Sequence, residues 1–118
     1  GLLAGLQEPV ESREFRIKIL AEDFRAEGEA VLDSLAEYAK EQPGWSIAPD
    51  NCEGVRVNLD KAHGDGWFLL RLSLHDPILP LNIESDREHG ARTIARQLAP
   101  FLAQQVNIDA SSALEFTL

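Results

Sequence analysis

Apolar and polar residues alternate along four segments of the chain, with the two-residue period of a half-buried β-strand. In the first segment Phe15, Ile17 and Ile19 share one face, and charged residues take the other. The alternating segments are residues 14–20, 55–60, 67–73 and 78–84. Because successive side chains of a strand point to opposite faces, the pattern predicts a sheet with one buried face and one polar face.

Pro80 lies inside the last alternating segment. Proline has no backbone N–H to donate to a neighbouring strand, so within sheets it is confined to edge strands and bulges. We therefore expect residues 78–84 to form an edge strand or to contain a bulge.

Two other segments repeat their apolar residues with the 3.6-residue period of an amphipathic helix. The first runs from about residue 23 to residue 42 and should end at the proline–glycine pair that follows. The second should begin at Ser85, because Ser85 and Glu88 have the spacing of a capping box. Pro100 should kink this second helix or end its regular part.

The predicted order is strand, helix, three strands, helix. It favours an α+β two-layer sandwich, a four-stranded antiparallel sheet with two helices on one face (β-α-β-β-β-α). The other face would be open, or covered by something outside this sequence. This domain should span residues 13–106, with residues 1–12 as a linker or the end of a preceding segment. Residues 107–118 should form a C-terminal tail, in which Leu114 and Phe116 pack as a short strand or a docked segment.

Composition narrows the possible partners. Twenty acidic against eleven basic side chains leave a net charge of −9, which repels a phosphate backbone, so we expect no nucleic-acid partner. No apolar run approaches the roughly 20 residues of a membrane span, so we expect no membrane partner. The single cysteine, Cys52, excludes an intrachain disulfide framework and favours a cytoplasmic protein, in which we expect Cys52 to be a buried small residue.

The chemically distinctive stretch is Trp67 to Pro77. Alternation places Arg71 and Ser73 on one face of a strand, at the point where the strand meets its loop. A guanidinium fork, a hydroxyl and the N–H groups of a turn form a suitable donor set for a phosphate. The alternative on the pattern alone is that Arg71 pairs with one of the many carboxylates at the strand end.

Three stretches of the chain together resemble a known family. They are EGVRV at residues 53–57, GWFLLRLSLHDP at residues 66–77 and LNIES at residues 81–85. In this order they resemble the C-terminal domain of the α-D-phosphohexomutases, the family of the phosphomannomutases and phosphoglucomutases. The specific part is the family's phosphate loop, Arg-x-Ser-Asn/Gly-Thr-Glu-Pro, and the similarity covers roughly residues 13–103.

The resemblance implies a TATA-box-binding-protein-like domain that binds the non-transferred phosphate of a hexose phosphate, glucose or mannose 1- or 6-phosphate. It would also close the active-site cleft during intramolecular phosphoryl transfer. Arg71 and Ser73 match the family's phosphate-binding arginine and serine, and Asp76 stands where the family usually has glutamate. Leu74 replaces asparagine or glycine and would contribute only its backbone N–H. His75 replaces threonine and would offer an imidazole donor, which, if protonated, would bind phosphate more tightly as the pH falls. The alternative is a loop histidine bonded to Asp76.

The family's phosphorylatable serine loop, its Asp-rich Mg²⁺ loop and its sugar-recognition loop have no counterpart in this sequence. The resemblance therefore implies that the chain belongs to a longer enzyme whose upstream domains supply the catalytic serine and Mg²⁺. The chain itself would then hold no catalytic residue and no cofactor. The alternative is a stand-alone α+β module that binds a small ligand or another protein without catalysis.

Overall fold

The computed structural model describes residues 8–49 and 54–118. Cys52, which was expected to be buried, and the first seven residues of the expected linker lie outside these ranges. The elements along the chain are β1 (Glu11–Ile19), α1 (Phe24–Lys40), β2 (Trp45–Ile47), β3 (Gly54–Leu59), the 3₁₀ turn η1 (Lys61–His63), β4 (Gly66–Arg71), β5 (Ile78–Ser85), α2 (Gly90–Gln104), β6 (Ile108–Asp109) and α3 (Ser111–Phe116).

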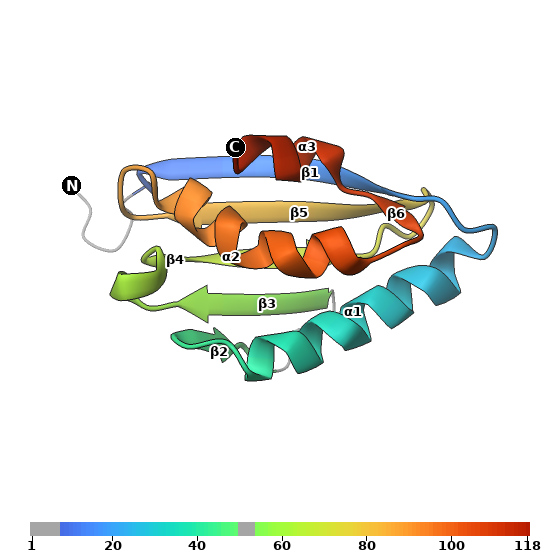
Figure 1. Ribbon diagram of the computed structural model, residues 1–118, viewed down its shortest axis with the longest axis horizontal. Helices are drawn as coiled ribbons and strands as arrows, with labels where there is room; N and C mark the ends of the chain where they lie inside the picture. Colours follow the sequence, from blue (N-terminus) through green and yellow to red (C-terminus); the bar gives the residue numbers. More distant parts are fainter. Residues whose placement is uncertain (1–7, 50–53) are drawn as a thin grey trace.

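The strands form one antiparallel sheet in the order β2-β3-β4-β5-β1-β6, and the helices lie over one of its faces (Figure 1). The predicted α+β class is confirmed, but the prediction of four strands is wrong, because the sheet has six. The two additional strands, β2 and β6, have three and two residues and lie at the two edges. Segments this short cannot show an alternating period, so the sequence pattern missed them.

The core lies between the sheet and the helices, and the strand register builds it row by row. Cross-strand partners such as Ile17 and Leu79, or Leu70 and Leu81, are fully buried. From the other layer, Leu35 of α1, together with Ile94 and Leu98 of α2, is equally buried. The apolar residues that the sequence assigned to one face of each strand are therefore the residues that the helices cover.

Pro80 does not mark an edge. Strand β5 lies between β4 and β1 in the interior of the sheet, so the expectation of an edge strand is wrong. The pairing of β4 with β5 ends at Leu70 and Leu81, immediately before Pro80 would need a partner in β4. The missing N–H therefore coincides with the end of a ladder, where it costs no regular hydrogen bond.

Ser85 is not a helix cap, and the predicted capping box with Glu88 is wrong, because α2 begins at Gly90. The Ser85 side chain is buried at the end of β5, where its hydroxyl donates to the Gly64 carbonyl at 2.5 Å and accepts from the Arg87 N–H at 3.1 Å. The helix α2 is capped instead by Glu11 in β1. Its carboxylate accepts from the backbone N–H groups of His89, at 2.9 Å, and Ala91, at 3.0 Å.

The C-terminal residues dock onto the sheet. Strand β6 pairs with β1, and α3 packs on β1 with the Phe116 ring 5.4 Å from the Phe15 ring. The C-terminal tail was expected to pack as a short strand or as a docked segment, and it docks as the short helix α3.

Pro100 lies inside α2, which continues past it to Gln104. Among the described residues no helix combines the length and the apolar character needed to cross a membrane.

The carboxylate of Glu11 is expected to make folding pH-dependent. Hydrogen bonds from the N–H groups at the start of α2 lower the pKa of Glu11 below its ordinary value of 4.5, against an opposing effect of burial. Because the folded pKa is depressed, the stabilisation is complete above pH 4.5 and is lost as the pH falls through the folded pKa. Glu11→Gln should therefore lower the free energy of unfolding by about 1 kcal/mol at pH 7, in the range of helix caps.

Urea unfolding at pH 7 and pH 3 measures this effect, with Glu14→Gln as the control, because Glu14 is exposed on the opposite face of β1. The gap between wild type and Glu11→Gln should narrow at pH 3, while Glu14→Gln stays close to wild type at both. A gap of equal size at the two pH values would contradict the role assigned to the ionised carboxylate.

Candidate functional site

Arg71 is the last residue of β4, and its neighbours on both sides anchor it. Leu70 is fully buried, and Leu72 packs against α1 at Gly28. A Cβ added to Gly28 would lie 2.5 Å from Cδ1 of Leu72, so a larger residue at that position would force the Leu72 side chain to shift. The strand and the helix together therefore fix where Arg71 leaves the sheet.

Residues 73–77 form a tight turn between β4 and β5, which we call the 73–77 turn. The Ser73 N–H donates to the Ile78 carbonyl at 3.1 Å, and the Ile78 N–H donates to the Asp76 carbonyl at 2.7 Å. Inside the turn, the Asp76 N–H lies 3.4 Å from the Ser73 hydroxyl oxygen. The Pro77 carbonyl accepts from the Ile19 N–H at 2.7 Å, which ties the turn to β1. The turn is thus held at both ends by backbone hydrogen bonds.

Two backbone donors at the tip of the turn have no partner within the part of the chain that the structure describes. These are the N–H groups of Leu74 and His75, both of which are exposed. Leu74 presents 70% of its surface to solvent, which is unusual for a leucine. The hydroxyl of Ser73 and the guanidinium of Arg71 are the neighbouring side-chain donors. The turn therefore offers several donors within a few residues, which is the composition of an anion site.

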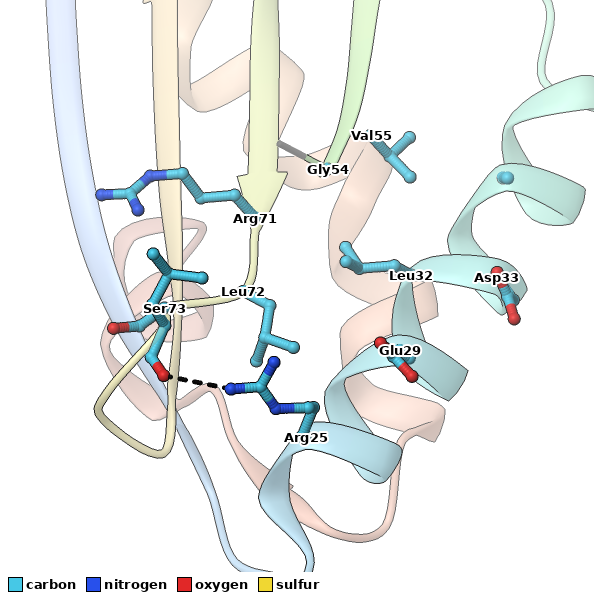
Figure 2. Close-up of a pocket in the computed structure, with 11 residues that line it drawn as sticks. Arg25, Glu29, Leu32, Asp33, Gly54, Val55, Arg71, Leu72 and Ser73 are labelled. Atoms are coloured by element: carbon cyan, nitrogen blue, oxygen red, sulfur yellow. Dashed lines mark hydrogen bonds between the residues drawn. The ribbon is translucent and has the colours of Figure 1, made fainter. Parts of the chain in front are cut away.

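A cleft of about 840 Å³ separates the 73–77 turn from α1 (Figure 2). Arg71, Ser73 and Leu74 line the cleft, whereas His75 and Asp76 lie outside it on the exposed side of the turn. On the helix side the cleft carries Arg25 but also Glu29 and Asp33. Their two carboxylates oppose the entry of a dianion between the turn and α1.

The residues that line the turn side of the cleft do not all point toward α1. Figure 2 shows the Arg71 side chain extending from the end of β4 across β5, while Leu72 turns toward α1. Ser73 lies beyond the end of β4, on the same side of Leu72 as the Arg71 side chain (Figure 2). Among the described residues no carboxylate lies within 4.0 Å of the Arg71 guanidinium, so the alternative of an ion pair is not found there.

Sequence reasoning missed Arg25. Its guanidinium lies between α1 and the turn, where Nη2 is 3.4 Å from the Leu74 carbonyl (Figure 2). A cation in the first turn of a helix faces the positive end of the helix dipole, so it is unfavourable there without another interaction. This unusual position, two residues after the N-cap Asp23, was the available signal. Arg25 supports the turn from behind rather than adding a donor to its exposed side.

No group of three or more His, Cys, Asp or Glu side chains in residues 8–49 and 54–118 is arranged to hold a metal ion. No protein-family model matches the chain, and no curated protein matches it significantly. The geometry of the site is that of an exposed cluster of hydrogen-bond donors beside one guanidinium.

The position of the turn should depend on Leu72. Replacing it with alanine removes the contact with α1 at Gly28 and should lower the free energy of unfolding by about 2 kcal/mol. It should also loosen the turn, so that the Ser73 amide exchanges with solvent faster. Chemical denaturation and hydrogen exchange measure the two effects. Leu20→Ala is the control, since Leu20 is 64% exposed, and equal behaviour of the two variants would contradict the anchoring role.

Proposed function

We propose that this chain is the phosphate-binding C-terminal domain of an α-D-phosphohexomutase, the family that its sequence resembles. The observation that carries the proposal is the placement of Arg71 and Ser73 on one side of the 73–77 turn, beside the exposed N–H groups of Leu74 and His75. These are the residues that match the family's phosphate loop.

A phosphate monoester suits this donor set for chemical reasons. A guanidinium can donate two parallel hydrogen bonds to phosphate oxygens, with a geometry that an ammonium does not reproduce. The hydroxyl of Ser73 and the N–H groups of the turn can satisfy further oxygens without adding charge. The ligand is expected on the exposed side of the turn, because the carboxylates of Glu29 and Asp33 disfavour a dianion in the cleft.

The two remaining residues have different roles in this proposal. Asp76 acts through the turn itself, since its N–H lies near the Ser73 hydroxyl and its carbonyl closes the turn to Ile78. His75 adds its backbone N–H and an imidazole on the exposed side.

In the complete enzyme this domain would hold the non-transferred phosphate of a glucose or mannose phosphate while the upstream domains of the same polypeptide carry out phosphoryl transfer with Mg²⁺. Its contribution would be positioning and closure. Holding one end of the substrate converts a bimolecular step into an intramolecular one, and closing the cleft excludes water.

Binding of phosphate by the 118-residue chain tests the proposal. Amide NMR titrations with inorganic phosphate, glucose 1-phosphate and mannose 1-phosphate should give saturable shifts confined to residues 71–76. Affinities should be similar for the three ligands, because only the phosphate is held. Arg71→Ala should weaken binding about tenfold or more, the loss of a charge-assisted hydrogen bond. Arg71→Lys should recover only part of it.

Arg92→Ala is the matched control, because it changes the net charge equally while Arg92 lies on α2, against Phe116. If Arg71→Ala and Arg92→Ala weaken binding equally, the attraction is general electrostatics and the proposal is wrong. Saturable shifts at another surface would instead favour the stand-alone ligand-binding module.

A further inference from the structure

Arg71 has a basic neighbour on the helix-free face of the sheet that the sequence does not bring near it. The regular ladder of β4 and β5 ends at Leu70 and Leu81, but the hydrogen bond from the Ser73 N–H to the Ile78 carbonyl continues its register, so Arg71 lies beside Pro80. Pro80 in turn pairs with Arg16 of β1. Partners in one cross-strand row point to the same face. Arg71, Pro80 and Arg16 therefore form a row across three strands, with two arginines flanking a proline.

The row is compact enough for both guanidiniums to reach one ligand. Adjacent strands are about 4.8 Å apart, so the Cα atoms of Arg71 and Arg16 are separated by roughly 10 Å. Figure 2 shows the Arg71 side chain already extending across β5 toward β1. Pro80 is buried although no helix covers this face, which is consistent with an arginine side chain lying over it.

The charged residues nearest to the row in β1 are one carboxylate, Glu14, and one ammonium, Lys18, each two residues from Arg16 on the same face. The cross-strand partner of Lys18 in β5 is Ile78, and that of Glu14 is Asn82. Lys18 has a carboxylate beside it, since Asp109 of β6 is its other cross-strand partner. Within the described ranges no carboxylate lies within 4.0 Å of Arg16 or Arg71.

Like charges in one cross-strand row disfavour each other, and an anion bound between Arg16 and Arg71 would offset that repulsion.

We propose that Arg16 is the second guanidinium of the phosphate site, so that a phosphate monoester dianion lies over Pro80 on the helix-free face, between Arg16 and Arg71. This inference rests on the proposed function and adds a phosphate-binding residue, Arg16, that the resemblance does not assign. The position of Arg16 also determines the side of the sheet from which the ligand approaches. The remainder of the ligand leaves the domain from the open face of the sheet, near the 73–77 turn, and not through the cleft beside α1.

Inorganic phosphate binding to Arg16→Ala tests the inference. Arg16→Ala should weaken the affinity about tenfold, the effect of one charge-assisted hydrogen bond. Arg13→Ala is the matched control, because Arg13 is exposed in the same strand but faces the other side, over the Phe116 ring. It should change the affinity less than twofold. In the wild-type chain, phosphate should shift the guanidino Nε–H resonances of both Arg16 and Arg71.

The outcomes separate this inference from the proposed function. If Arg71→Ala removes binding while Arg16→Ala behaves like Arg13→Ala, the proposed function stands and the role of Arg16 is wrong. If Arg71→Ala leaves binding intact, the proposed function fails first. Arg16→Lys guards against a local structural effect, since it keeps the charge and the aliphatic stem and should restore part of the affinity.

Discussion

The rest of the structure depends on the double pairing of β5. This strand lies between β4 and β1, and its alternate residues Leu79, Leu81 and Ile83 are fully buried under the helices. A shift of one residue in either register would turn all three to the helix-free face, so burial specifies the register strongly. Once the register is set, it also determines which polar residues share a row on the open face. The composition of the candidate site is therefore a consequence of core packing.

The two ends of β5 are used differently. At one end Ser85 is buried and bonded to the loop before β4, and the nearby Glu11 carboxylate caps α2, so the sheet and the helix layer are joined there. At the other end the chain forms the exposed 73–77 turn, which carries unpaired donors among the described residues. A firmly connected end and a polar, accessible end suit a domain that presents a rigid turn to a ligand.

Net charge is a poor guide to where an anion can bind on this chain. The total is −9, and α1 contributes carboxylates to the cleft behind the turn, yet the row formed by Arg16 and Arg71 has no carboxylate contact in the described ranges. Because charges are screened beyond about 8 Å at physiological salt, the groups in the immediate surroundings matter more than the sum. An acidic surface elsewhere would also discourage polyanions such as nucleic acids while leaving a small phosphate ester free to approach.

The sequence alone determined the features that depend on local periodicity. The four alternating segments and the first helix follow from side-chain spacing within a few residues. Tertiary structure decided the features that join distant segments. Glu11 caps a helix 78 to 80 residues away, Pro80 lies in an interior strand, and Arg16 reaches the row of Arg71 only because β1 pairs with β5. Alternation states which face a residue takes, but it carries no information on which strand becomes its neighbour, and that choice is made by packing the whole core.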